Sequence, residues 1–489
     1  MQKREIVARF LEAGLLVHPD VVTYISESGG SGVIEGIISS LPSGISVVTT
    51  KEVPGMTAPR LDKLNVGVSP VPEILAGREG SSIPTANPEE SFALFRDRYD
   101  TLAAMMRPRV SPIPIEALVK QNSRFSDTDI GAIGMVVEGS TSAKGHRIVE
   151  IEDPTGTIKV LFNKNREGFD EAEKIIPDEV IGVRGKLSRD NGGGGGGMIF
   201  SDTLFRPEIP LTHVISPSKE PGKAVFISDV HVGSDTFLPD AWNRFASWLD
   251  KTPEVRYLLI AGDVVDGIGI YPNQDKELHI KTIYEQYDAV GEMLSALPSH
   301  LQIILSPGNH DAVRAAEPQP ALPEEFRTQF PTNVTFVENP AMVNIQSVNV
   351  LMYHGRSIDD LIKFIPGSSY EKPGDIMEAM LKRRHLGPIY GQRTPLLSTP
   401  ADNLVIRDVP DILHTGHVHI TDVVNYRGVL GINAGTWQAQ TSFQKQMNIT
   451  PTPAEAVVVD LATMQHEILR FLDPPTEKRS TLNFAEKHH

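Results

Sequence analysis

Residues 223–234 read KAVFISDVHVGS, an apolar run that passes into a polar loop carrying Asp229 and His231. A short apolar run that ends abruptly in polar residues is typical of a buried strand in a parallel sheet. Residues two apart along a strand point the same way, so Asp229 and His231 present both side chains to one place. The pattern therefore indicates an α/β fold with functional groups at the carboxyl ends of its strands.

The same pattern of a buried strand and a polar loop recurs four times. It appears as RYLLIAGDVVDG at 256–267, LQIILSPGNHD at 301–311, VNVLMYHGRS at 348–357 and DILHTGHVH at 411–419. An amphipathic helix with Trp242, Phe245, Trp248 and Leu249 is predicted after the first strand, and further strands are predicted within 423–472. The later loops add the following residues to the first pair: Asp263, Asn309, His310, Asp311, His354, His417 and His419.

The ligand types favour divalent cations held by nitrogen and oxygen atoms. The chain has no cysteine, so thiolate sites and disulfides are excluded. His, Asp and Asn donors suit two divalent ions, with Mn as the first choice and Fe, Zn and Mg as alternatives. Two ions that share a water lower its pKa and stabilise the attacking and leaving oxygens in phosphate ester cleavage. A structural role, in the core or as a cap, could explain any single His or Asp among these residues. It does not explain the occurrence of all five motifs in order, each after an apolar strand.

Smaller domains are predicted before the α/β segment. Five short alternating runs with a helical insert at 168–176 predict an OB-fold barrel at 120–210, in which the glycines at 192–197 form a loop. Helical spacing predicts an N-terminal helical domain at 1–50, and Pro- and Gly-rich sequence predicts a linker and connecting helix at 51–115. We expect the helix at 92–109 to end at Pro108. The α/β domain is then expected at 220–475.

Composition limits the classes of function. The formal net charge of −16 argues against a general nucleic-acid binder unless metal ions, local basic patches or a basic partner hold the phosphates. No apolar run is long enough to predict a membrane span. The start of the chain, interrupted by Arg9, Glu12 and Asp20, is interpreted as an amphipathic helix and not as a signal peptide. A cysteine-free chain fits a reducing cytosol, so a cytoplasmic protein is expected.

The five motifs DVH, GDVVDG, GNHD, YHG and GHVH resemble those of the calcineurin-like metallophosphoesterases over about 223–440. The resemblance implies a β-sandwich flanked by helices. It assigns one metal to Asp229, His231, Asp263 and His419, and the other to Asp263, Asn309, His354 and His417, with Asp263 bridging. It further implies that His310 stabilises the transition state or protonates the leaving oxygen. Asp311 would orient His310, whereas Asp266 has a structural reading alongside a functional one.

A barrel directly before a phosphoesterase domain resembles the B subunits of replicative DNA polymerases. Eukaryotic B subunits typically lack the metal ligands, but every ligand position is filled here, which indicates the archaeal family D small subunits. The segments 95–109, 380–396 and 431–454 are similar to that family. The resemblance implies 3′→5′ exonuclease activity on a DNA 3′ end, a large catalytic subunit as partner, and a sliding clamp in the complex. The barrel is expected to serve as a scaffold against the large subunit.

Two other readings of the whole chain stay open, and so does the role of a basic cluster. One alternative is a stand-alone metallophosphatase or phosphodiesterase, and the other is a non-catalytic scaffold subunit with a vestigial site. Tyr390 and Trp437 are candidates for stacking on an unpaired base, with core packing as the alternative. The candidate DNA contacts, with a solvated helix face as their alternative, are Lys382, Arg383, Arg384, His385 and Arg393.

Overall fold

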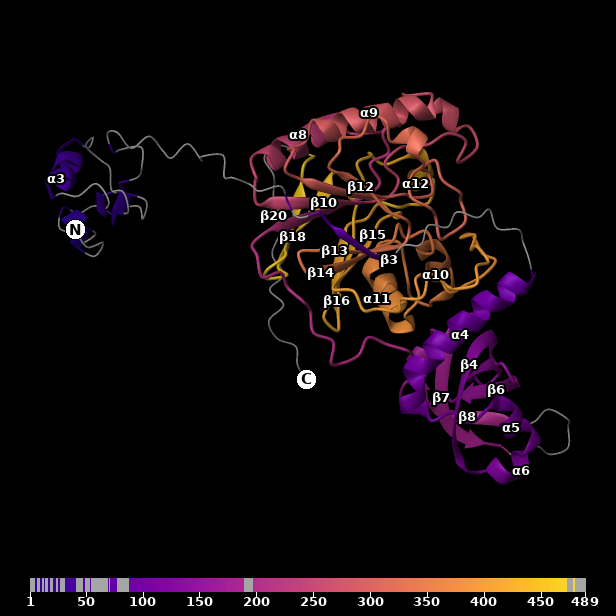
Figure 1. Cartoon of the computed structure of the whole chain (residues 1–489). Helices are drawn as coiled ribbons and strands as arrows, with labels where there is room; N and C mark the ends of the chain where they lie inside the picture. Colours follow the sequence, from indigo (N-terminus) through magenta and orange to yellow (C-terminus); the bar gives the residue numbers. More distant parts are fainter. Residues whose placement is uncertain are drawn as a thin grey trace. The chain divides into compact units, whose positions relative to one another are not determined.

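The computed structural model describes residues 69, 71–76, 88–188, 197–472 and 478–479, together with short stretches among residues 5–53 (Figure 1). The chain divides into two compact units, with the boundary between Gly67 and Val68. In the first unit, helix α3 (Ser31–Ser40) accompanies two short parallel strands, β1 (Leu16–Val17) and β2 (Val47–Val48). Its apolar core includes Ile6 and Phe10, which lie in the predicted helical region 1–50.

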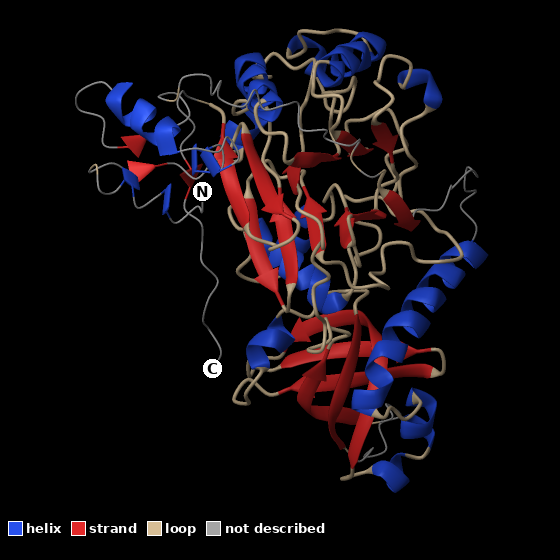
Figure 2. Ribbon diagram, turned by 60° about the vertical axis from the view of Figure 1, so that its left-hand side comes forward, coloured by secondary structure: helices blue, strands red, loops and turns tan. Residues whose placement is uncertain are grey.

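The second unit contains a sandwich of two sheets (Figure 2). The seven-stranded sheet has the order β12 (Val334–Phe336), β11 (Gln302–Ser306), β10 (Val255–Ala261), β9 (Lys223–Ile227), β18 (Glu455–Asp460), β19 (His466–Arg470) and β20 (Lys478–Arg479). The six-stranded sheet has the order β16 (Asp422–Tyr426), β17 (Val429–Asn433), β15 (Ile412–Thr415), β14 (Val348–Met352), β13 (Ala341–Ile345) and β3 (Glu73–Ala76). All five motif-bearing loops follow strands of these two sheets, as the sequence predicts.

Successive side chains of a strand face opposite sides of the sheet, so each sheet has one face toward the other sheet and one face toward the covering helices. In β9, Ala224 and Phe226 pack between the two sheets, whereas Val225 and Ile227 face the opposite side. That outer side is covered by α8 (Pro239–Asp250) and α9 (Ile283–Ser295). The other sheet is covered by α10 (Ile358–Phe364) and α11 (Pro373–Arg383). Helices therefore cover both outer faces of the sandwich, and the predicted β-sandwich flanked by helices is confirmed.

The strands β4 (Asp129–Thr141), β5 (Arg147–Asp153), β6 (Gly156–Phe162), β7 (Val180–Leu187) and β8 (Met198–Phe205) close into the predicted OB-fold barrel. Their order around the barrel is β4-β5-β6-β8-β7. The insert forms α7 (Phe169–Glu173), and α5 (Ile115–Lys120) and α6 (Asn122–Phe125) precede the barrel. Gly192 to Gly196 of the predicted glycine loop lie outside the described residues.

Two local expectations in the region before the barrel were wrong. Residues 73–76 of the predicted linker form the edge strand β3, which pairs antiparallel with β13. The connecting helix α4 (Pro88–Val110) passes through Pro108 and continues to Val110. Val110 is fully buried against Gly131 and Gly182 of the barrel, and this packing holds the last turn in place despite the proline. Among the described residues, no helix is both long and apolar enough to cross a membrane.

Candidate metal centre

The predicted ligands share an unusual backbone conformation. Asp229, His231, Asp263, His417 and His419 all have positive φ values, between 51° and 70°. This left-handed region is unfavourable for residues other than glycine, by roughly 1–2 kcal/mol each, and less for Asp. Such residues persist only where the surrounding structure holds them, and they cluster at functional sites. These five residues lie in three loops at strand ends, and their side chains gather at one site.

Two motif glycines are required because their neighbours approach too closely for any side chain. A Cβ atom on Gly308 would lie 2.2 Å from Oδ1 of Asp263. A Cβ on Gly416 would lie 1.9 Å from Oγ of Ser228 and 2.5 Å from Oδ2 of Asp229. These distances are far below van der Waals contact, so the glycines of GNHD and GHVH let the loops press against the carboxylates.

One group of ligands gathers around Asp229. Nε2 of His419 lies 3.3 Å and Nε2 of His231 lies 3.7 Å from Oδ1 of Asp229, and the two ring nitrogens are 3.1 Å apart. Asp229 is fully buried, and its Oδ1 makes no hydrogen bond. A buried carboxylate oxygen without a donor, facing two imidazole nitrogens, fits a cation between the three side chains.

A second group gathers around Asp263. Nε2 of His354 lies 3.3 Å from Oδ2 of Asp263 and 3.1 Å from Oδ1 of Asn309. Asp263, His354 and His417 form a set of ligand atoms within 4.8 Å of one another. The same Oδ2 of Asp263 lies 4.0 Å from Nε2 of His231 in the first group. Asp263 therefore stands between the two groups, the position expected of a bridging ligand.

Each histidine that is a candidate ligand has one ring nitrogen close to an outer partner. The partners are the Ala261 carbonyl for Nδ1 of His354 at 2.8 Å, Asp266 Oδ1 for Nδ1 of His231 at 3.2 Å, Gln444 Nε2 for Nδ1 of His419 at 2.8 Å and Asp359 Oδ2 for Nε2 of His417 at 3.4 Å. Such partners fix ring orientation and leave the second nitrogen for a metal.

Asp266 therefore has a defined place in the site, and sequence reasoning missed Asp359 and Gln444. The spacing Thr441 to Gln444 is a capping-box signal, and the structure forms that box at the start of α12 (Ser442–Gln446). The capping-box signal predicts that a helix begins after the last motif. It does not predict that Gln444 lies beside His419. Asp359 lies in the first turn of α10 and carries no comparable motif.

The prediction that Asp311 orients His310 was wrong. Oδ2 of Asp311 accepts hydrogen bonds from the backbone N–H groups of Asp263 and Gly308, both at 2.8 Å, and Oδ1 accepts one from the Tyr287 hydroxyl at 3.2 Å. Nδ1 of His310 instead lies 2.6 Å from the backbone carbonyl of Asp266. Asp311 thus holds two ligand loops together, and its sequence neighbour His310 is oriented by a main-chain oxygen.

The electrostatics of the site favour cations. Burial by itself lowers the pKa of His231 and His354, but the facing carboxylates raise the two pKa values to about 10 and about 9. Burial likewise raises the pKa of Asp229 and Asp263, yet the neighbouring histidines hold both pKa values below their usual range. Ionised carboxylates that draw protons onto buried imidazoles would accept divalent cations in place of those protons.

Replacing Asp359 with Asn is expected to weaken metal binding at the His417 site by about 10- to 100-fold. The substitution removes the charge that holds His417, while the Tyr370 hydroxyl, 2.9 Å from Asp359, keeps a partner. Calorimetric titration with Mn²⁺ measures the change. Asp360→Asn is the matched control, because Asp360 accepts from the backbone N–H groups of Arg393 and Thr394. Equal affinities in the wild type and Asp359→Asn would contradict the anchoring role.

The predicted DNA-contact cluster does not form an open basic surface. Arg383, Arg384 and His385 are 4%, 3% and 1% exposed. Arg383 pairs with Glu179 of the barrel, Arg384 donates to the carbonyls of Ile406 and Arg407, and His385 pairs with Asp402. The two arginine side chains and the His385 ring are therefore engaged inside the fold and are not available to phosphates.

The two other members of the cluster differ from these three. Lys382 pairs with Glu378 at 2.9 Å and lies 5.7 Å from the Tyr426 ring. Arg393 is exposed, and its charge helps to lower the pKa of Asp359, although burial opposes that shift and His417 contributes more. Arg393 thus lies near the metal centre and stays a candidate for DNA contact.

Arg383→Ala is expected to destabilise the protein by about 3 kcal/mol, because it leaves Glu179 buried with a weakened ion pair. Arg206 remains 3.6 Å from Glu179 and limits the loss. Thermal unfolding measures the effect, and exposed Arg393→Ala, expected to change stability by less than about 0.5 kcal/mol, is the control. A similar midpoint for both variants would contradict the structural role of Arg383.

The two candidate stacking residues behave differently. Trp437 is fully buried among the rings of Trp242, Phe245 and Phe471, so the core-packing alternative holds for it. Tyr390 is 37% exposed and packs edge-on against Phe95.

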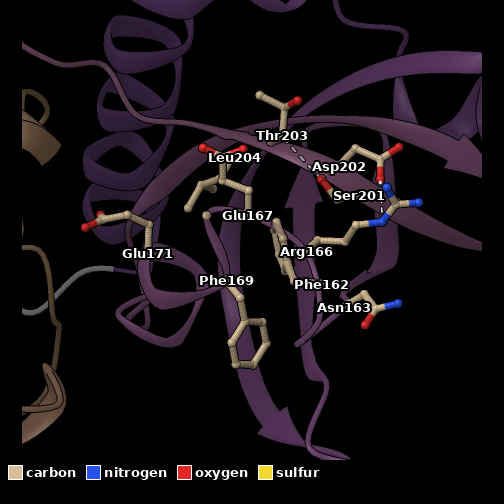
Figure 3. Close-up of a pocket in the computed structure, with 11 residues that line it drawn as sticks. Phe162, Asn163, Arg166, Glu167, Phe169, Glu171, Ser201, Asp202, Thr203 and Leu204 are labelled. Atoms are coloured by element: carbon tan, nitrogen blue, oxygen red, sulfur yellow. Dashed lines mark hydrogen bonds and ion pairs between the residues drawn. The ribbon is translucent and has the colours of Figure 1, made fainter.

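A hollow of about 320 Å³ lies on the barrel (Figure 3). It is lined by acidic and basic side chains, among them Glu171 and the ion pair of Arg166 with Asp202 at 3.9 Å. The hollow shares no residue with the metal centre. Its mixed charge offers no continuous basic track of the kind that follows a nucleic-acid backbone.

Comparison with known proteins identifies the family. A family model for the B subunit of DNA polymerases alpha and epsilon matches residues 224–421, and one described as OB-fold nucleic acid binding domain matches residues 132–209. The DNA polymerase II small subunit of Halobacterium salinarum is 43% identical over 405 residues, which cover 82% of this chain and 78% of that protein.

Two further proteins called DNA polymerase II small subunit match at similar length. The protein of Methanothermobacter thermautotrophicus is 41% identical over 409 residues, covering 80% of this chain and 82% of that protein. The protein of Thermoplasma acidophilum is 34% identical over 465 residues, covering 94% and 91%. Identity of this extent over most of both chains shows that the protein belongs to the family of archaeal DNA polymerase II small subunits, the small subunits of the family D polymerases.

Proposed function

We propose that this chain is a two-metal 3′→5′ exonuclease that removes nucleotides from the 3′ end of DNA within a polymerase complex. The observation that carries the proposal is the complete ligand set, in which Asp263 lies between two groups of donors and His310 stands beside them. A protein with a vestigial site has no need to keep five ligands in an unfavourable backbone conformation.

The two donor groups would form two cation sites. Asp229, His231 and His419 would hold one ion, and Asn309, His354 and His417 would hold the other, with Asp263 shared. Divalent cations bound there would activate water and neutralise charge on a phosphodiester. Nitrogen and carboxylate donors together suit Mn²⁺, with Fe, Zn and Mg as alternatives.

In this proposal His310 acts on the reacting phosphate. Because its Nδ1 faces the Asp266 carbonyl, Nε2 is the free nitrogen, and His310 forms a set of close ligand atoms with His231 and Asp263. In the reaction, a water oxygen bonds to phosphorus and the bond to the 3′-oxygen of the penultimate nucleotide breaks. His310 would stabilise charge on the phosphate or supply the proton to that leaving oxygen. A nucleoside 5′-monophosphate is released.

The partners follow from the family. The relatives are named as small subunits, so a large catalytic subunit is the proposed partner. A sliding clamp in the complex is proposed from the resemblance to the polymerase B subunits alone. With a net charge of −16, the chain requires its metal ions, isolated cations such as Arg393, or a basic partner to retain DNA.

An end-labelled exonuclease assay tests the proposal. The purified chain is stripped of metal with a chelator, reconstituted with Mn²⁺, and given single-stranded DNA and a primer–template with a 3′ mismatch. Stepwise release of monophosphates from the 3′ end, only after reconstitution, is the expected result. The assay is repeated with the large subunit added. No cleavage in either form would overturn the nuclease assignment and favour a scaffold role.

A further inference from the structure

A loop beside the metal centre exposes apolar side chains. Every residue from Ile268 to Asn273 is exposed, and three of the six are large and apolar: Ile268 at 46%, Ile270 at 40% and Tyr271 at 37%. We call these three residues the apolar loop. A surface turn is normally built from small polar residues, and adjoining exposed apolar side chains usually mark a contact with a ligand or partner.

The apolar loop is fixed at its base by buried amides. Gln274 is 1% exposed; its Nε2 donates to the carbonyl of Asp266 at 2.8 Å, and its Oε1 accepts from the backbone N–H of Ile270 at 3.0 Å. Gln286 is fully buried and accepts from the backbone N–H of Gly267 at 2.9 Å. The backbone is therefore held from within, while the apolar side chains face solvent.

The loop begins directly at the reactive groups. The Asp266 carbonyl that accepts from Gln274 also faces Nδ1 of His310 at 2.6 Å, and Ile268 follows two residues later. A Cβ atom on Gly267 would lie only 2.4 Å from the carbonyl oxygen of His310. A phosphate next to His310 and the two cation sites thus has the apolar loop as an adjoining surface.

We propose that the apolar loop is the platform on which the unpaired base of the 3′-terminal nucleotide stacks during cleavage. This inference rests on the proposed nuclease function. A nucleobase is flat and apolar on both faces. Its stacking on an aromatic ring such as that of Tyr271 tolerates any sequence, and Ile268 and Ile270 add apolar contact. A paired terminal base is stacked and hydrogen-bonded in the duplex. A mismatched terminal base leaves the duplex at a lower cost in free energy. The apolar loop therefore favours frayed or mismatched 3′ ends.

The test compares oligonucleotides that differ only in the terminal base. One ends in a normal nucleotide and the other ends in a tetrahydrofuran abasic residue with the same phosphodiester. Each is given, with Mn²⁺, to the full chain assembled with its large subunit, as wild type and as Ile270→Ser/Tyr271→Ser. The control is Leu211→Ser/Val214→Ser, which changes two apolar residues that are 86% and 80% exposed outside the site.

The wild type and the control are expected to cut the base-bearing end about tenfold faster in kcat/KM than the abasic end. The loop variant should cut both ends at the abasic rate and lose its preference for mismatched over paired ends. Equal loss on both substrates, or no preference in the wild type, would overturn the platform. Failure of the loop variant to assemble with the large subunit would assign the surface to that protein instead. No cleavage of either end by the wild type would count against the nuclease function itself.

Discussion

Asp263→Asn is expected to abolish nearly all nuclease activity and to release metal from both sites. Asp263 is the one side chain shared by the two donor groups, and Asn keeps its shape but loses the charge. The loss of a bridging carboxylate removes several kcal/mol of stabilisation from the reaction, which corresponds to at least about a 10³-fold fall in rate. The metal content after dialysis and the rate on single-stranded DNA are the two measurements.

Asp411→Asn is the control for this substitution. Asp411 is buried at the start of β15 and accepts hydrogen bonds from the backbone N–H groups of Ser216 and Asn349, both within 2.9 Å. Its replacement tests the cost of losing a buried carboxylate in the same domain without touching a ligand. If Asp263→Asn kept two equivalents of metal, Asp263 would not be the bridge.

The gathering of most candidate ligands at one place was predictable from their order along the chain. Strands such as β9 and β10 are short apolar runs, and parallel strands bring their carboxyl ends to one edge of a sheet. Asp229 and Asp263 were therefore expected to meet although the sequence separates them. Gly308 and Gly416, which precede Asn309 and His417, are part of the same motifs. Only glycine fits at these two positions, because any Cβ atom would clash with the carboxylate of Asp263 or Asp229.

The outer partners were not predictable because they depend on tertiary packing. Asp359 reaches His417 only after α10 packs against its sheet, and nothing in the local sequence distinguishes Asp359 from its neighbour Asp360. Asp311 was misread for the opposite reason. Its position beside His310 indicated a contact, but the chain turns so that the carboxylate faces the backbone of Asp263 and Gly308.

The run KRRH at 382–385 was misread because charge alone predicts exposure. Arg383 ends α11 and Arg384 turns into the left-handed region with φ of 53°, which directs the following residue inward. The compensating acids are distant in sequence: Glu179 comes from the barrel and Asp402 from a later loop. A buried cation is recognised from its partner, and the partner is visible only in the folded chain.

His310→Ala is expected to leave both metals bound and to lower kcat by about 10²- to 10⁴-fold. His310 is half-buried, and its backbone N–H, which alanine retains, donates to Oδ1 of Asp263 at 2.8 Å. The loss should therefore fall on the chemical step and not on the metal content. Single-turnover rates at saturating DNA, with metal analysis of the same sample, separate the two effects.

His310→Asn distinguishes chemistry from positioning at this residue. An asparagine amide nitrogen can occupy the place of Nδ1 and donate to the Asp266 carbonyl, but it supplies nothing in place of Nε2. If Nε2 acts on the leaving oxygen or the phosphate, the Asn variant should be as slow as the Ala variant. If the Asn variant instead recovers most of the rate, His310 serves only to hold the backbone of Asp266 and the apolar loop that follows it. Nuclease activity would then depend on the metal ligands and on the placement of the 3′ end.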